Sequence, residues 1–209
     1  MLERSLRELG KPRFVSIRGD VPTGPGGSEP LGTTGSPPLP KLIDNRRYLD
    51  SGPGTTVDEL RERIRPLSLE VAAISADGET IEYAPILGIG DEVRLPEVWA
   101  KVKDKHLIHN HPRSTMLSWE DLEFAIDNDL KSITAVLNVG GDLRLERKGN
   151  EWPPLDQVKR AYSTGVHRAA EVAVSKKLKR DRFRELLVKE INGAFKAAFG
   201  SDAIQIDLQ

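Results

Sequence analysis

Hydrophobic and polar positions divide the chain into three zones. Residues 53–150 hold short apolar runs separated by turn signals, which is typical of a sheet with helices packed on it. Residues 151–209 show apolar positions at helical spacing. Residues 1–52 show no period, and eleven of the nineteen residues from 22 to 40 are Gly or Pro. We therefore predict a disordered N-terminal segment, a folded domain and a C-terminal helical extension, with boundaries at 52/53 and 150/151.

The middle zone predicts strands and helices in a mixed order. The Asp77-Gly78 pair is a hairpin turn signal between the first two strands, and Pro112 ends the third because it lacks a backbone N–H. The expected strands are 67–75, 80–87, a histidine-rich strand ending at residue 111, 133–139 and 142–147. The expected helices begin after Thr56, at Pro96 and after Ser118. This order predicts an α/β (α+β) fold in which helices flank a sheet.

Two helices are predicted in the C-terminal zone. Apolar residues recur at helical spacing from 155 to 173 and again from 183 to 198, and Gly200 is a typical C-terminal cap. A basic segment lies between them. Its charged residues are Lys176, Lys177, Lys179, Arg180, Arg182 and Arg184. We interpret this segment as a solvated turn, with a nucleic-acid contact as the alternative, because no aromatic residues are interleaved with the charges.

The candidate chemistry lies between His106 and Asp121. Three of the four histidines of the chain fall in the first six residues of this stretch. Successive side chains of a strand alternate between its faces, so His109 and His111 point the same way. Asp121 lies in the first turn of the helix after Ser118, from which a carboxylate can reach back to the strand end. Two imidazoles and one carboxylate would leave a fourth position open, as in a catalytic zinc site.

A structural interpretation explains the same residues without a metal. Ser-x-x-Asp at a helix start is a common capping arrangement, so Ser118 and Asp121 could serve only as a cap. A single histidine is more often a core or surface residue than a ligand. The combination of His109 and His111 on one strand face with a serine and an aspartate at capping distance favours the metal site.

The order His-x-His-Pro, a short loop and Ser-x-x-Asp resembles the motif of the JAMM (MPN+) zinc metalloproteases. The sequence His-Asn-His-Pro at 109–112 is similar to the form of the motif in the bacterial RadC-like branch of that family. The resemblance covers residues 67–147. One departure is visible. Six residues, not the usual seven, separate His111 from Ser118, which resembles shorter-loop variants associated with phage structural proteins and bacterial toxin modules.

The resemblance implies a fold, a cofactor and a mechanism. The fold would be a JAMM/cytidine-deaminase-like mixed sheet with flanking helices. His109, His111 and Asp121 would bind Zn²⁺, and Ser118 would help to position the scissile carbonyl. A glutamate on an upstream strand would act as the general base, so that a metal-activated water hydrolyses the bond.

Glu70 is the candidate for that base. It lies in the first expected strand between the apolar residues Leu69 and Val71, where a charge is costly unless it has a function or a partner. Glu79, beside the hairpin turn, and Glu82, on the returning strand, are the competing carboxylates. The alternative without a catalytic role is that Glu70 faces solvent on a half-covered sheet.

Composition narrows the classes of function. The chain has 209 residues, a formal net charge of -1 and no cysteine. The lack of cysteine excludes disulfides, thiolate nucleophiles and cysteine-ligated zinc, and with them zinc fingers and zinc-dependent nucleobase deaminases. The near-neutral charge gives no general attraction to nucleic acid or anionic lipid. Because no run of 18 apolar residues and no signal-peptide core exist, we expect a cytoplasmic protein that does not enter the membrane.

Three functions remain open. The first is a zinc-dependent peptidase or isopeptidase whose substrate is a protein or peptide, such as a flexible tail or a ubiquitin-like linkage. The second is a RadC-like protein associated with DNA or mobile elements. The third is a non-catalytic interaction module on the same fold. Zinc content and a Glu70 variant would separate the first from the third, and a DNA-binding titration would test the second.

Overall fold

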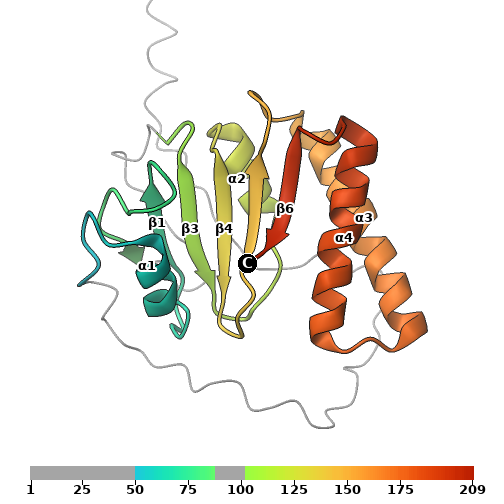
Figure 1. Ribbon diagram of the computed structural model, residues 1–209, viewed down its shortest axis with the longest axis horizontal. Helices are drawn as coiled ribbons and strands as arrows, with labels where there is room; N and C mark the ends of the chain where they lie inside the picture. Colours follow the sequence, from blue (N-terminus) through green and yellow to red (C-terminus); the bar gives the residue numbers. More distant parts are fainter. Residues whose placement is uncertain (1–49, 88–101) are drawn as a thin grey trace, which may run out of the picture.

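The computed structural model describes residues 50–87 and 102–209, which form a mixed α/β fold around a six-stranded sheet (Figure 1). The strands lie in the order β2-β1-β3-β4-β5-β6. In chain order the elements are α1 (Val57–Ile64), β1 (Val71–Ser75), β2 (Ile86–Leu87), β3 (His106–His111), α2 (Trp119–Asp127), β4 (Ser132–Leu137), β5 (Leu143–Arg147), α3 (Leu155–Lys176), α4 (Arg180–Phe199) and β6 (Ile204–Leu208). The predicted mixed sheet with flanking helices is confirmed at this level.

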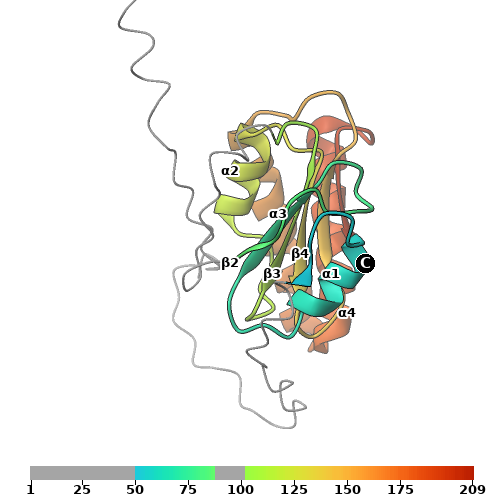
Figure 2. The ribbon, with the colours of Figure 1, turned by 90° about the vertical axis from the view of Figure 1, so that its left-hand side faces the viewer.

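The two central strands, β3 and β4, run parallel and are covered on both faces. Every residue of β4 is buried, and so are the last five of β3. Parallel strands are usually covered in this way, because the crossover that joins them places a helix on the sheet. Here the crossover contains α2, and Figure 2 shows α2 and α1 on opposite sides of the sheet.

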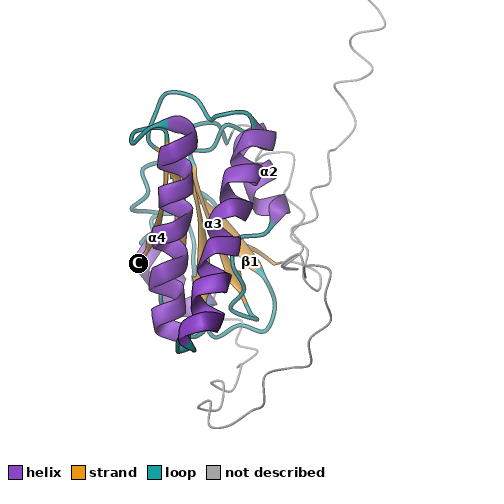
Figure 3. Ribbon diagram, turned by 90° about the vertical axis from the view of Figure 1, so that its right-hand side faces the viewer, coloured by secondary structure: helices purple, strands orange, loops and turns teal. Residues whose placement is uncertain are grey.

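Each face of the sheet has its own hydrophobic core. The smaller core, under α1, contains Leu60, Ile64 and Ile108. The larger core lies under α2, α3 and α4, which Figure 3 shows in front of the strands. Successive side chains of β3 point to opposite faces of the sheet, so Leu107 lies in the larger core and Ile108 in the smaller one. The histidines at 109 and 111 follow Leu107 in the same alternation and therefore enter the larger core beside α2.

The C-terminal segment packs as two helices and then returns to the sheet. A Cβ atom on Gly165 of α3 would lie 2.5 Å from the Cα atom of Ile191 in α4, so the close approach of the helices requires glycine there. Both predicted helices are present, and Gly200 is the C-cap of the second. The prediction of a purely helical extension is corrected by β6, which pairs with β5. Five alternating residues are too few to indicate a strand without knowledge of the partner.

The first strand is shorter than predicted. It was expected from residue 67, but β1 begins at Val71, and residues 67–70 have no regular structure. The side chain of Asn110 accepts a hydrogen bond from the Val71 N–H and donates one to the Leu69 carbonyl. These backbone groups are therefore bound by a side chain, and the β1–β3 ladder stops at this point.

The returning strand is also shorter than predicted. Of the expected range 80–87, the structure keeps two isolated bridges, at Thr80 and Ile81, and the two residues of β2. The carboxylate of Asp77 accepts hydrogen bonds from the N–H groups of Glu79 and Thr80. The strand is interrupted at residues 82–85, which have no regular structure and include Pro85, a residue without a backbone N–H to donate to a ladder.

Two expectations fall on parts of the chain that lie outside the described residues. These are the helix beginning at Pro96 and the disordered segment as far as residue 49. At the edge of that segment, Ser51 is buried and its hydroxyl accepts a hydrogen bond from Arg63 at 2.8 Å. Within the described ranges, no helix has the length and apolar character needed to cross a bilayer.

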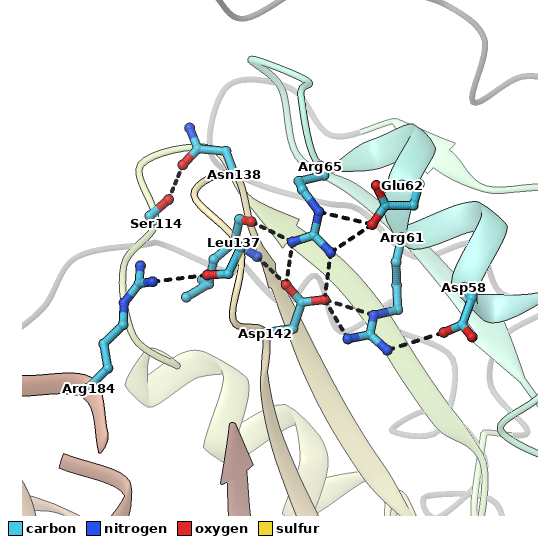
Figure 4. Close-up of polar contacts among 10 residues, drawn as sticks. Asp58, Arg61, Glu62, Arg65, Ser114, Leu137, Asn138, Asp142 and Arg184 are labelled. Carbon is cyan, nitrogen blue, oxygen red and sulfur yellow. Dashed lines mark hydrogen bonds and ion pairs between the residues drawn. The ribbon is translucent and has the colours of Figure 1, made fainter. Parts of the chain in front are cut away.

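Asp142 is a fully buried carboxylate that joins α1 to the turn between β4 and β5 (Figure 4). Arg65 donates to its Oδ1 atom at 2.6 Å, and Arg61 donates to its Oδ2 atom at 2.7 Å. Oδ1 also accepts from the Leu137 N–H at 3.0 Å, and Arg65 donates to the Leu137 carbonyl at 2.7 Å. Leu137 is the register partner of His111, so this network fixes the strand end beside the histidines.

The Asp142→Asn variant should lose about 3–5 kcal/mol of unfolding free energy, because it removes the buried counter-charge of two partly buried guanidinium groups and leaves them only their exposed carboxylate partners. Asp58→Asn is the matched control. Asp58 pairs with the same Arg61, but its side chain is 90% exposed, and we expect a loss below about 1 kcal/mol. Urea denaturation of both variants measures the difference, and equal losses would contradict the assigned importance of the buried charge.

Candidate metal centre

β3 brings two imidazoles together on one face. The Nε2 atoms of His109 and His111 lie 2.7 Å apart, and both side chains are buried. His106 belongs to the other face by the alternation of the strand, and its Nδ1 atom lies 2.7 Å from the Ser132 hydroxyl. The third histidine of the strand is therefore separate from the group.

Asp121 of α2 completes the group. Its Oδ1 atom lies 3.1 Å from His109 Nε2, and its Oδ2 atom lies 3.4 Å from His111 Nε2. The same carboxylate closes a capping box, because Oδ2 accepts from the Ser118 N–H at 2.7 Å and Ser118 Oγ accepts from the Asp121 N–H at 3.1 Å. The cap predicted as the structural alternative is thus present, and it aims the carboxylate at the histidines.

The three side chains lie close enough together to share one metal ion. Their closest atoms are separated by 2.7, 3.1 and 3.4 Å. Ligand atoms at ~2.0–2.1 Å from zinc in a tetrahedral arrangement lie about 3.3 Å from one another. The two carboxylate distances involve different oxygens of Asp121, and with one ligand atom from each residue the three atoms lie within 4.8 Å of one another. Asp121 Oδ1 is buried and accepts no aligned hydrogen bond from the described residues. In the part of the chain that the structure describes, these residues could hold a metal ion.

The hydrogen bonds of His111 leave its Nε2 atom facing His109 and Asp121. Its Nδ1 atom lies 3.0 Å from the Thr115 carbonyl, which can only accept, so Nδ1 carries the proton. Support of a ligating histidine by a backbone carbonyl is typical of metal sites. At 2.7 Å the Nε2 atoms of His109 and His111 are hydrogen-bonded when one of them carries a proton, and the tautomers decide which one donates. A bound metal would take the place of that proton.

Burial and mutual contact set the charges of the group. Burial would raise the pKa of Asp121, but the two imidazoles outweigh it and hold this pKa well below its usual range. Burial lowers the pKa of His109, and Asp121 offsets this only in part. For His111, burial is outweighed by Asp121 and by the charge of Glu70, and the pKa is raised. Asp121 is therefore an anion, the form in which a carboxylate binds a cation.

Small residues surround His109 within the sheet. Its register partners are Ala72 on β1 and Ala135 on β4, and both are buried. Directly paired residues of neighbouring strands lie on the same face. Within the sheet, the imidazole of His109 is therefore flanked by one methyl group on each side.

Glu70 reaches this region from the segment before β1. Its side chain is 2% exposed, and its charge acts on His111, which indicates that the carboxylate lies near the group. It was predicted inside a strand, whereas the structure places it one residue before β1. Of its predicted competitors, Glu79 is exposed and Glu82 pairs with Lys105 at 2.5 Å. Glu70 is thus the buried member of the three candidate carboxylates.

Asn110 holds the backbone on both sides of Glu70. Its Oδ1 atom accepts from the Val71 N–H at 2.7 Å, and its Nδ2 group donates to the Leu69 carbonyl at 3.0 Å. Asn110 lies between the two histidines and points to the opposite face of β3. One strand therefore presents the imidazoles on one face and fixes the neighbouring Glu70 segment from the other.

Replacing Asn110 by Ala should lower the unfolding free energy by about 1–3 kcal/mol, since the buried N–H of Val71 and the partly buried carbonyl of Leu69 lose their partner. Zinc affinity should stay unchanged, because the side chain faces away from the metal position. Asn192→Ala is the matched control, because Asn192 binds the N–H and carbonyl of Ile206 in the same manner, far from Glu70. Thermal unfolding and zinc titration test this, and weaker zinc binding in Asn110→Ala would contradict it.

Two residues of this centre are missing from the predicted set. Thr115 supports His111, and Asn110 positions the Glu70 segment. A polar residue between two histidines of a buried strand is the available sequence signal for Asn110. Its backbone partners lie 39 and 41 residues away, so the sequence alone cannot identify them.

Comparison with known proteins adds nothing to the interpretation of this site, which therefore rests on its geometry. No family model, no curated protein and no solved structure matches this chain.

Proposed function

We propose that this chain is a zinc-dependent peptidase or isopeptidase, similar in its motif to the RadC-like branch of the JAMM (MPN+) metalloproteases. The observation that carries the proposal is the convergence of His109, His111 and Asp121, whose ligand atoms, one from each residue, all lie within 4.8 Å of one another. Structural zinc sites use four protein ligands, whereas three protein ligands leave a position for water or substrate. Glu70 supplies a further buried carboxylate beside this group.

Each of these residues has a defined task in amide hydrolysis. When bound, zinc lowers the pKa of a water molecule to about 7 and polarises a carbonyl group. Glu70 accepts a proton from the attacking water and passes it to the leaving amine, so that the amide is cleaved to an acid and an amine. The Ser118 oxygen accepts the capping hydrogen bond, which leaves the hydroxyl proton to donate to the carbonyl oxygen.

The substrate class follows from the resemblance. We infer a protein or peptide with a flexible tail or a ubiquitin-like linkage. An extended segment of this kind can bring its scissile carbonyl to a buried centre, whereas a folded surface cannot.

Metal analysis and hydrolysis assays of the purified protein test the proposal together. We expect about one zinc per chain. We also expect cleavage of at least one member of a panel of peptide and ubiquitin-like fusions, loss of cleavage after chelation and its return with zinc. A protein that binds no zinc after zinc loading and dialysis would overturn the proposal.

Other outcomes identify the alternative functions. Zinc binding without cleavage of any fusion would favour a non-catalytic interaction module. Tight DNA binding at physiological salt would favour the RadC-like DNA-associated function. In the structure, Lys176, Lys177 and Lys179 are exposed at the turn between α3 and α4, which is where such binding would be mapped.

A further inference from the structure

A buried tyrosine of the C-terminal segment contacts the residues that lead into α2, the helix that carries Asp121. Tyr162 lies on α3, its side chain is buried, and its hydroxyl donates to the Leu117 carbonyl at 3.1 Å. The ring packs edge-on against Trp119, with 5.7 Å between the ring centroids, and tilted against Phe195 at 6.5 Å. Aromatic packing thus fixes the ring, and the hydrogen bond fixes the hydroxyl.

One peptide group connects this hydroxyl to Asp121. The carbonyl of Leu117 and the N–H of Ser118 belong to the same planar peptide. Tyr162 donates to the oxygen of that peptide, and the nitrogen donates to Asp121 Oδ2 at 2.7 Å. Hydrogen bonds arranged in such a chain strengthen one another and hold the intervening group in place.

We propose that Tyr162 is a positioning residue for the metal ligand Asp121, so that α3 forms part of the metal centre. The inference rests on the proposed zinc site and deepens it. Residues that orient a ligand usually change metal affinity when they are replaced, by roughly 10–100-fold. The segment outside the recognised motif would then be needed for full zinc affinity.

The chemistry of the hydroxyl supports a role beyond core filling. A phenylalanine would bury the same ring without a polar group, and a buried hydroxyl is costly unless it is bonded. Burial and the charge of Asp121 both raise the pKa of Tyr162, so the hydroxyl keeps its proton and remains a donor. The hydroxyl donates to the Leu117 carbonyl, and the N–H of the same peptide binds the carboxylate of Asp121.

The test compares Tyr162→Phe with the wild-type protein. Zinc affinity is measured by competition with a chromophoric chelator, and the stability of the metal-free protein by its urea midpoint. We expect Tyr162→Phe to bind zinc roughly 10–100-fold more weakly. Tyr162→Met serves as a second variant without the hydroxyl, because methionine adapts to irregular core space, and the same loss is expected.

Trp152→Phe is the matched control. The Trp152 ring N–H donates to the Leu130 carbonyl at 2.7 Å, which is the same kind of bond from the C-terminal segment to the loop after α2. We expect Trp152→Phe to lower the urea midpoint of the metal-free protein without changing zinc affinity. Equal weakening of zinc binding in the Tyr162 and Trp152 variants would show a general structural effect and overturn the inference.

The remaining outcomes separate this inference from the proposed function. If the wild-type protein binds no zinc, the proposed function fails. If the wild-type protein binds zinc and both Tyr162 variants bind it with unchanged affinity, the positioning role alone fails.

Discussion

Glu70→Gln should leave zinc binding intact and lower the rate of hydrolysis by roughly 10²–10⁴-fold, the usual contribution of a general base. Glutamine keeps the shape of the side chain and most of its hydrogen bonding, but it cannot accept a proton at neutral pH. The ligand set proposed for zinc does not include Glu70, so the metal should remain. The measurement is the initial rate on a cleaved fusion, with zinc content determined on the same sample.

Glu82→Gln is the matched control for this variant. Glu82 is a carboxylate of the same hairpin, but it pairs with Lys105 at 2.5 Å and is partly exposed. Its replacement should leave the rate unchanged. If Glu70→Gln loses zinc, then Glu70 is a ligand rather than the base. If Glu70→Gln keeps its full rate while Glu82→Gln loses it, the base is Glu82.

His111→Ala should abolish the stabilisation of the fold by zinc. A ligand that binds only the folded state at 1,000 times its Kd adds about 4 kcal/mol to the unfolding free energy. Loss of one of three protein ligands leaves too few donors for tight binding, so the unfolding temperature of His111→Ala should not respond to zinc. Thermal scans with zinc and with chelator measure this response.

His106→Ala is the control on the same strand. His106 belongs to the opposite face and contacts Ser132, so its loss should change the stability but preserve the zinc response. A zinc response that disappears in both variants would indicate binding at adventitious histidines. A response that survives in His111→Ala would remove His111 from the site.

The sequence was sufficient to predict the helices and strands whose signals lie within a few neighbouring residues. β3 and α2 are where they were expected, because alternation, Pro112 and the Ser118 cap are all encoded within a few residues. The same alternation brought His109 and His111 to one face. These predictions needed no knowledge of the rest of the fold.

The sequence was insufficient where a distant partner decides the structure. The position of Glu70 depends on Asn110, and the burial of Asp142 depends on Arg65, which is 77 residues away. β6 is a strand only because β5 offers it an edge. Periodicity within a short window contains none of this information, so these features required the three-dimensional arrangement.

The location of the proposed ligands within one crossover has a consequence for folding. His109, His111 and Asp121 fall within residues 109–121, between the end of β3 and the first turn of α2. The entropy lost on closing a short loop is small, whereas contacts with Tyr162 or Arg65 require much longer stretches of chain to come together. A chain that has formed only β3 and α2 would therefore already possess all three ligands. Zinc could then join these two elements before the outer strands add to the sheet, and act on assembly as well as on the finished site.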